Sequence, residues 1–424
     1  MKTLYSIITL LLFCSNSVIS QKQLTLGNAI QIGLEKNYGI LISRNISEQA
    51  NLRNTYGMAG ALPTIKLGAS GFINEDFVES TSTENIQASA EINWTLFNGF
   101  AIKANKAQLE NSEMLSKGNE MIEIESTIQS IINSYYYVVL QNKMVEIKKT
   151  IFEISKDRYE QQKTASELGV GGHYELVLAE TDYLNDKTSF LNQELTYKNA
   201  IRQLNLLLAL PIESEWILSD QLEISSTNYQ LSVMKEMMFE NNTNLKNQYL
   251  NIKAKEIELT TMRSELYPTI GVNASFAIGS NNQGFKNTHF QRPQVGFNIS
   301  YTLFNGGKIK RNIEIAQLNT LEQELITEQA KLTLEKELYT QFENYILYKE
   351  LQILEKEKMR SAEVLLTLSN QKFKAGNINS FDYREVQLSY LNSAVSQLNT
   401  NLELIFANTE LLRLTGGILS VSNK

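Results

Sequence analysis

Apolar and polar side chains alternate one by one in four separate stretches of the chain. They are residues 64–74, 86–97, 269–279 and 294–304. A period of two is typical of a β-strand whose two faces meet different surroundings, because successive side chains point to opposite faces. Polar segments at 75–85 and 280–291 separate the two members of each pair. The pattern therefore predicts two β-hairpins.

The second of these stretches shows the alternation most clearly. Its apolar face holds Ile86, Ala88, Ala90, Ile92, Trp94 and Leu96, and Ser89 belongs to its polar face. About ten such residues are enough to cross a bilayer with one face toward lipid and the other toward water. A half-buried strand of a soluble sheet would show the same alternation, so a single strand is weak support. Four strands, paired two and two, favour a membrane β-barrel portion.

Two long segments follow a helical period instead. Apolar residues are spaced alternately by three and four in 101–165, and they recur every seven residues in 307–374. The first set is Met121, Ile124, Ile128, Ile131, Tyr135 and Val138, and the second is Leu318, Leu325, Leu332, Tyr339, Ile346 and Ile353. Such spacing is the seam of a coiled coil. At about 1.5 Å per residue, each helix would be on the order of 90–100 Å long.

The second half of the chain repeats the first. "WTLFNGFAIK" begins at residue 94 and "YTLFNGGKIK" at residue 301, an offset of 207 positions. "ALPTI" at 61–65 and "LYPTI" at 266–270 form a second pair, and "ELGVGGHYEL" at 167–176 and "KAGNINSFDY" at 374–383 form a third. Each half is therefore predicted to run helix, strand, loop, strand, very long helix, tight turn and helix.

The paired motifs mark the ends of the predicted elements. Pro63 and Pro268 precede the first strand of each hairpin and are expected to stop an incoming helix. The second strands are expected to end at Asn98-Gly99 and Asn305-Gly306, where a long helix begins. Trp94 and Tyr301 lie near these strand ends on the apolar face, where an aromatic ring suits a membrane interface.

Glycines mark the far ends of the long helices. Gly169 and Gly376 interrupt the helical pattern and predict tight turns at 167–173 and 374–380. The helices predicted at 24–59 and 173–210 both run toward the strands. We expect them to stack end to end beside the single long helix that starts at residue 101.

The N-terminus has the layout of a secretory signal peptide. Lys2 precedes an apolar run at 4–13, and Ser20 fits a small-residue cleavage site, so we expect residues 1–20 to be removed. A membrane anchor is the alternative, but the run is too short for a bilayer core of about 30 Å. Cys14, the only cysteine, would be lost with this segment. No disulfide would then stabilise the exported protein.

The repeats divide the 424 residues into parts. We expect a first repeat at 21–211, a connecting equatorial segment at 212–228 and a second repeat at 229–424. A composition of 42% hydrophobic and 20% charged residues is ordinary for a folded protein. The formal net charge of −7 argues against nucleic acid as a partner.

Together the motifs resemble the TolC-like outer-membrane efflux proteins. The resemblance covers the mature chain and rests on the duplicated half, "PTI" before each hairpin, "TLFNG" after it and the turn "FKAGNINSFDYREV". It implies a homotrimer whose four strands per chain close a twelve-stranded barrel in the outer membrane of a Gram-negative bacterium. A helical tunnel would continue through the periplasm to an adaptor (membrane fusion) protein and an inner-membrane pump of the RND or ABC type. Four strands alone would leave two open edges, which a bilayer does not tolerate.

The resemblance also implies a gate at the tip of the tunnel. Counted from the turn glycine, its acidic positions fall on Asp382 and Glu385, and Glu175 is the first-half counterpart of Asp382. An acid near a helix N-terminus can also simply complement the helix dipole. Some relatives carry a latching arginine two residues after the turn glycine, but Ile378 occupies that position here.

Nothing in the sequence points to an enzyme or to a cofactor. His173 and His289 are isolated, and we expect both in solvated loops. There is no nucleophile–base pair, phosphate loop or cluster of metal ligands. The sequence therefore predicts an outer-membrane duct for efflux or type I secretion, and a periplasmic structural coiled-coil protein without a pore is the alternative.

Overall fold

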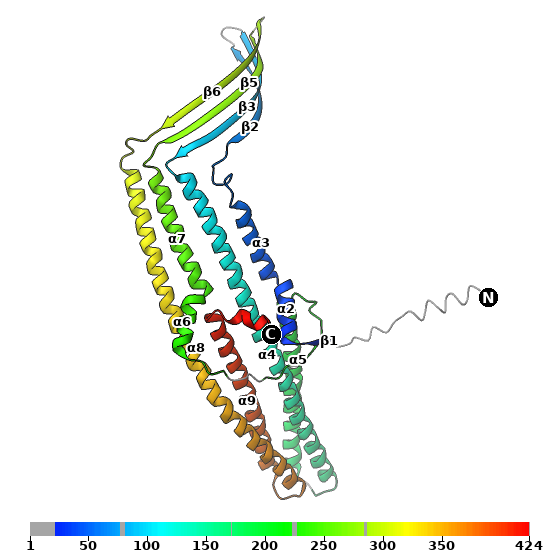
Figure 1. Cartoon of the computed structure of the whole chain (residues 1–424). Coiled ribbons are helices and arrows are strands. Elements are labelled where there is room, and N and C mark those ends of the chain that lie inside the picture. The colour runs from blue at the N-terminus through cyan, green and yellow to red at the C-terminus, as the bar shows by residue number, and fades with distance from the viewer. Residues whose placement is uncertain (1–21, 77–80, 171, 223–226, 284–285, 424) are drawn as a thin grey trace, which may run out of the picture.

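The computed structural model describes residues 22–76, 81–170, 172–222, 227–283 and 286–423. The predicted signal peptide, residues 1–20, lies outside the described residues. The molecule is long and narrow, with a four-stranded sheet at one end and two helical hairpins at the other (Figure 1). Long helices run between these ends, and shorter elements surround them near the middle.

The two halves contain corresponding elements. The first half comprises β1 (Lys22–Leu24), α2 (Leu26–Lys36), α3 (Tyr38–Arg53), β2 (Thr64–Asp76), β3 (Thr81–Asn98), α4 (Ala101–Glu167), α5 (His173–Leu207) and β4 (Trp216–Leu218). The second comprises α6 (Leu231–Asn241), α7 (Thr243–Ser264), β5 (Thr269–Gln283), β6 (Lys286–Ser300), α8 (Lys308–Lys374), α9 (Ser380–Leu414) and a 3-10 turn, η1 (Ile418–Asn423). Both α4 and α8 have 67 residues, and both α5 and α9 have 35. The predicted duplication is confirmed.

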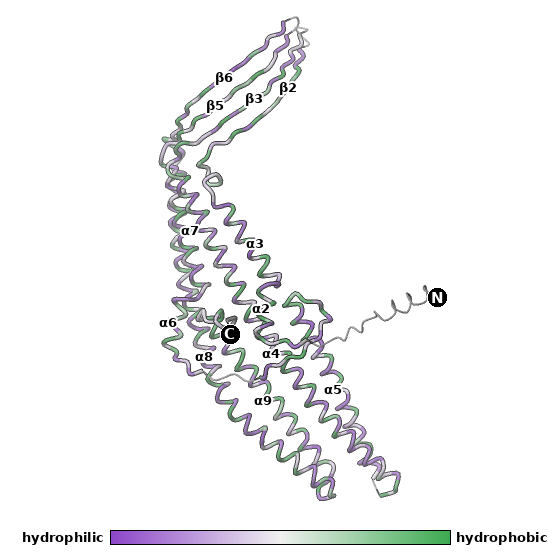
Figure 2. Tube along the Cα trace, turned by 45° about the vertical axis from the view of Figure 1, so that its right-hand side comes forward, coloured by the Kyte–Doolittle hydropathy of each residue, from purple (hydrophilic) through white to green (hydrophobic). Residues whose placement is uncertain are grey.

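The four long strands form one antiparallel sheet in the order β2-β3-β5-β6. Its register places apolar residues opposite apolar residues. For example, Ala90 of β3 pairs with Leu67 of β2 and with Phe276 of β5. Figure 2 shows the alternation of hydropathy along the strands. No described residue of the chain covers the apolar face, and Leu67 is 84% exposed.

The strands are longer than the alternation predicts, and the loops are shorter. Most of the predicted loops at 75–85 and 280–291 belongs to the strands, because backbone hydrogen bonds continue the ladder whether the side chains are polar or apolar. His289, expected in a surface loop, lies in β6 opposite Ser280. At the other end β6 stops at Ser300, so Tyr301 lies one residue beyond the strand.

The strand-to-helix exits use residues in the left-handed conformation. Gly99 and Phe100 have φ angles of 66° and 72°, and the side chain of Asn98 accepts a hydrogen bond from the Ile102 amide at 3.0 Å. A left-handed phenylalanine is strained. The Phe100 ring makes edge contacts with the ring of Phe97 at 5.2 Å and with that of Tyr267 at 5.8 Å, and these contacts help to hold it. Two glycines, Gly306 and Gly307, take the same conformation in the second half.

The prediction of one continuous helix at 24–59 is wrong. The chain breaks at Asn37 between α2 and α3, and α3 ends at Arg53. Pro63 therefore does not end this helix, whereas Pro268 closely follows the end of α7 at Ser264. Helix propensity does not predict the break at Asn37, because the break depends on a contact of Asn37 with the distant Leu207 carbonyl.

One asparagine side chain joins two helices end to end in each half. The Oδ1 atom of Asn37 accepts the Ile40 amide at 3.2 Å at the start of α3, and its Nδ2 donates to the Leu207 carbonyl at the end of α5 at 2.8 Å. Asn242 does the same, accepting from Leu245 at 3.0 Å and donating to the Leu414 carbonyl at 3.0 Å. The end-to-end stacking predicted for the first half is thus present between α5 and α3, and α9 and α7 repeat it in the second half.

Two apolar clusters form the core, at the level of these junctions. The larger surrounds the middle of α4, where Ile128, Ile131, Tyr135 and Val138 are completely buried against α2, α5, α9 and η1. The smaller packs Leu338 and Tyr345 of α8 against α6 and α9. Because α9 contributes to both clusters, it ties the two halves together.

The heptad stripes of α4 and α8 have different surroundings. The stripe of α4 is buried inside the chain from Ile128 to Val138, but most of the stripe of α8 faces outward: Leu318 is 64%, Leu332 69% and Ile353 66% exposed. The seam predicted for α8 therefore has no intrachain partner among the described residues. No helix in the described part of the chain is long and apolar enough to cross a membrane.

We predict that Asn242→Ala weakens the junction between α7 and α9. It removes a helix cap, at about 1 kcal/mol, and orphans the buried Leu414 carbonyl, at about 1–3 kcal/mol. The free energy of unfolding in detergent should fall by about 2 kcal/mol or more in total. Asn45→Ala is the control, because Asn45 is exposed on α3 and its side chain bonds, among the described residues, only to the Leu41 carbonyl of its own helix. Equal stabilities of the two variants would contradict the role of the junction.

Candidate gate at the helical tip

Two tight turns close the helical hairpins at the end of the molecule away from the sheet (Figure 1). Gly169 and Gly376 have φ angles of 74° and 73°, which glycine adopts without strain. The Val170 amide bonds the Ala165 carbonyl at 3.0 Å, and the Asn377 amide bonds the Lys372 carbonyl at 2.8 Å. These bonds satisfy carbonyl groups that the ending helices would otherwise leave free.

The three acids predicted for the gate lie close to these turns. Glu175 is in the first turn of α5, Asp382 is in the first turn of α9, and Glu385 is three residues further on. All three are exposed. In the described part of the chain none of them forms an ion pair, so their charges face solvent. Ile378, at the position of the possible arginine latch, lies in the turn before α9.

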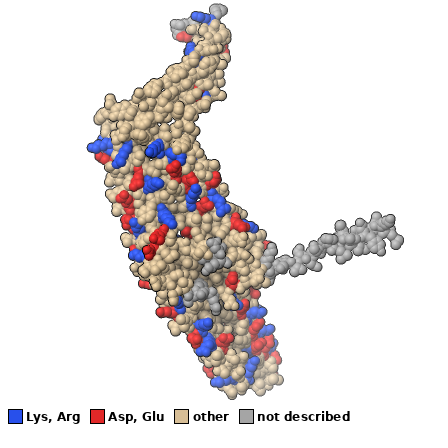
Figure 3. Space-filling view, viewed as in Figure 1, with Lys and Arg blue, Asp and Glu red and all other residues tan. Residues whose placement is uncertain are grey.

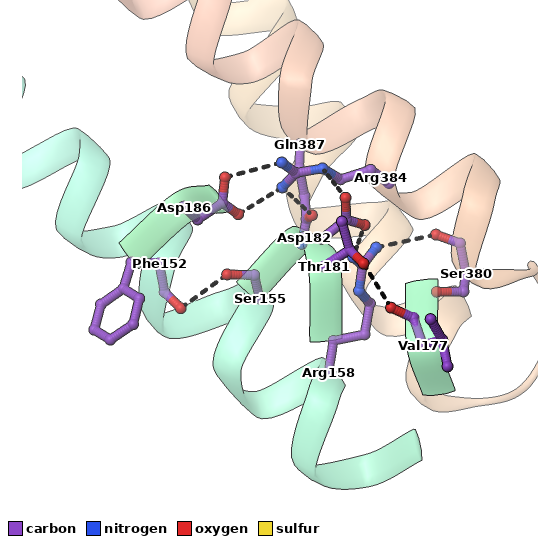
Figure 4. A network of polar contacts seen from close by, with 10 residues as sticks. All are labelled: Phe152, Ser155, Arg158, Val177, Thr181, Asp182, Asp186, Ser380, Arg384 and Gln387. Carbon is purple, nitrogen blue, oxygen red and sulfur yellow. Dashed lines mark hydrogen bonds and ion pairs between the residues drawn. The ribbon is translucent and has the colours of Figure 1, made fainter. Parts of the chain in front are cut away.

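A network of four charged side chains lies just above the tip and was missed by the sequence analysis (Figure 4). Arg158 of α4 pairs with Asp182 of α5. Arg384 of α9 binds both carboxylate oxygens of Asp186 at 2.7 and 2.9 Å, and its Nε lies 3.7 Å from Asp182. The network therefore ties α9 of the second repeat to the α4–α5 hairpin of the first.

The network is largely shielded from water. The side chain of Arg158 is 1% exposed and that of Asp186 is 10% exposed. Burial on its own would lower the pKa of Arg384, but the hydrogen bonds and charges of Asp186 and Asp182 raise this pKa above its ordinary value. Two positive and two negative charges balance, which is the condition for burying ions at tolerable cost.

Several polar atoms beside the network are buried and have no hydrogen-bond partner among the described residues. They are Nε of Arg158, the hydroxyl groups of Ser380 and Tyr383, and Nε2 of Gln387. Arg158 and Tyr383 also line a small polar cavity of about 90 Å³ between α4, α8 and α9. Such a cavity has room for ordered water, which would satisfy the donors of Arg158 and Tyr383. The packing between α9 and α4 is thus polar rather than apolar at this level.

The sequence contains a signal for this network. Asp182 and Asp186 are four residues apart on one helix face, where like charges repel unless a cation compensates them. The compensating arginines are 24 residues before Asp182 and 198 residues after Asp186. Sequence spacing alone does not reveal pairs so distant in the chain.

The described residues contain no group of three or more His, Cys, Asp and Glu side chains that could hold a metal ion. His173 is exposed at the start of α5, and His289 lies in β6.

Comparisons with known proteins agree with this architecture. Residues 236–417 match the family model described as "Outer membrane efflux protein". The resemblance to the TolC-like outer-membrane efflux proteins is confirmed. No curated protein matches the sequence.

Solved structures of outer membrane channels share the fold over nearly the whole chain. The CmeC outer membrane channel of Campylobacter jejuni is 15% identical with a TM-score of 0.78, covering 92% of this chain and 85% of that one. The MtrE outer membrane channel of Neisseria gonorrhoeae, in its open state, is 16% identical with a TM-score of 0.76, covering 93% and 89%. VceC of Vibrio cholerae is 13% identical with a TM-score of 0.74, covering 92% and 96%.

We predict that Arg384→Gln loosens the tip. The substitution removes charge-assisted hydrogen bonds, worth about 1.5–3 kcal/mol, and leaves Asp186 without its main partner. Amide hydrogen exchange in residues 380–390 should therefore become faster by about ten- to a hundredfold, the change that this free energy corresponds to.

Arg360→Gln is the matched control for this measurement. Arg360 is 75% exposed on α8, and its one ion pair in the described part of the chain is with Glu357 of the same helix. Its loss should leave exchange at the tip unchanged. If both variants exchange like the wild type, the network does not stabilise the tip.

Proposed function

We propose that the protein is a passive duct in the outer membrane, the exit channel of a tripartite efflux pump or a type I secretion system. The sheet carries this proposal: it has one apolar and one polar face, and its apolar face is uncovered. The likeness to solved outer membrane channels supports it. The chain would have no catalytic step of its own.

Two surfaces without partners in the described chain, the edges of the sheet and the apolar stripe of α8, support assembly into a homotrimer. The sheet order leaves β2 and β6 with unpaired edges, and such edges are not tolerated in lipid. The exposed stripe of α8 has the heptad spacing of a coiled-coil seam. Three copies would pair β6 of one chain with β2 of the next and close twelve strands, while the α8 stripes would pack between neighbouring chains.

The remaining parts of the system are proposed by the same reasoning. The helical tunnel would extend into the periplasm of a Gram-negative bacterium, where a periplasmic adaptor opens its tip and an inner-membrane pump of the RND or ABC type supplies the energy. The cargo, whether drug, metal ion or polypeptide, would be selected largely by these partners. Genes for an adaptor and a pump beside this one would support the proposal.

The facing of the sheet has a direct test. Ala90 lies on the apolar face between Leu67 and Phe276, so Ala90→Arg should cost about 2–4 kcal/mol near the bilayer midplane and reduce membrane assembly. The neighbouring Ser89→Arg should be tolerated, because position 89 faces water in the lumen. Assembly is measured as the amount of detergent-extracted trimer in outer-membrane fractions. Similar yields for the two variants would contradict this facing.

The acids of the tip should control which ions pass. Three carboxylates per chain, Glu175, Asp382 and Glu385, would place nine around the entrance of a trimer. Such a ring concentrates cations, so the channel should prefer cations and be blocked by multivalent cations. Both properties should be lost in the double variant Asp382→Asn, Glu385→Gln in bilayer recordings. If that variant keeps wild-type selectivity and block, these acids only complement the helix dipoles.

Planar-bilayer recording of the wild-type protein separates the two candidate functions. A closed trimer should give discrete, reproducible conductance steps. A periplasmic structural coiled-coil protein without a pore would give none. A monodisperse monomer in detergent-free buffer would also overturn the proposed channel.

A further inference from the structure

We propose that Arg292 forms a ring of positive charge inside the barrel and thereby draws anions into the outer part of the duct. The inference rests on the proposed closed trimer. Arg292 lies on β6 opposite Ala277 of β5. Val295 and Phe297, at odd positions of the same strand, belong to the apolar face. Arg292, at an even position, therefore belongs to the polar face that lines the lumen.

The guanidinium of Arg292 is held in place by a ring rather than by an acid. Its Cζ lies 4.3 Å from the centre of the Phe290 ring, which is a cation–π stack. Gly279 pairs with Phe290, and a Cβ atom on Gly279 would lie only 2.8 Å from that ring. The absence of a side chain at Gly279 thus lets the ring lie across the sheet. Phe290 packs over Gly279, and Arg292 stacks on Phe290, so the three residues form one packed cluster on the polar face.

The charge of Arg292 is not compensated within the described part of the chain. No described carboxylate lies within ion-pair distance of its guanidinium. In the next row of the sheet, Lys66 and Glu91 lie directly opposite each other, so their charges offset. Across the sheet from Arg292, the next two strands carry small side chains: Ala277 on β5 and Ser89 on β3. They leave open space around the positive group.

One uncompensated charge per chain matters because the sheet carries few charged side chains. Figure 3 shows a sheet surface that is mostly free of charged side chains, with the few on this face near its outer end. Twelve strands spaced about 4.8 Å apart and tilted about 40° would place the backbone about 12 Å from the barrel axis. The Debye length is about 10 Å at 0.1 M salt, so three guanidinium groups would act across the lumen. Anions would be enriched there, whereas the acidic tip enriches cations.

Reversal potentials in a KCl gradient test the ring. Arg292→Gln should raise the permeability ratio of potassium to chloride by at least about twofold, and Arg292→Glu should raise it further. Ala277→Glu places a carboxylate opposite Arg292 and should act like Arg292→Gln with the arginine intact. Lys286→Gln is the control: it removes the same charge at the end of the hairpin, beside bulk solvent, and should have a smaller effect.

The outcomes separate this inference from the proposed function. Absence of conductance from the wild type would overturn the channel itself. Conducting variants with wild-type selectivity would overturn the ring and leave the channel standing. Equal shifts for Arg292→Gln and Lys286→Gln would also overturn it, because total charge rather than the stack would then set the preference. Light scattering of each variant in detergent confirms that trimers are compared.

Discussion

The architecture depends on covering a 67-residue helix along its whole length. No single partner does so, and two shorter helices must therefore meet end to end beside it. Where they meet, the last carbonyl groups of one helix and the first amides of the next would lack partners. One asparagine serves both ends, Asn37 in the first half and Asn242 in the second. The head-to-tail arrangement also brings a positive helix end against a negative one.

The position of these junctions organises the rest of the molecule. The two apolar clusters lie at the same level, so the middle is the well-packed part of the chain. Toward the sheet, aromatic contacts around Phe100 support the change from strand to helix. Toward the tip, the charges of Arg158, Asp182, Asp186 and Arg384 join α9 to the α4–α5 hairpin. Polar packing is easier to separate in water than an apolar core, which would suit the gate proposed at this end.

Much of the fold follows from the sequence, because local patterns encode it. Alternation located the four strands, heptads located α4 and α8, and the repeated motifs revealed the duplication. The hairpin ends were mislocated because strand pairing continues through polar residues, as at His289. The break at Asn37 and the pairing of Arg384 with Asp186 depend on contacts between distant parts of the chain. A single sequence does not report such contacts.

The different exposure of the apolar stripes of α4 and α8 affects how a newly made chain behaves before it assembles. The α4 stripe is sheltered as soon as the chain folds, whereas the α8 stripe and the apolar sheet face remain bare. Exposed apolar surfaces of this size promote aggregation in water. If the proposed trimer forms, a lone copy would expose both surfaces and would be prone to aggregate before it assembles. The rate at which copies meet, more than the folding stability of one chain, would then decide how much protein matures.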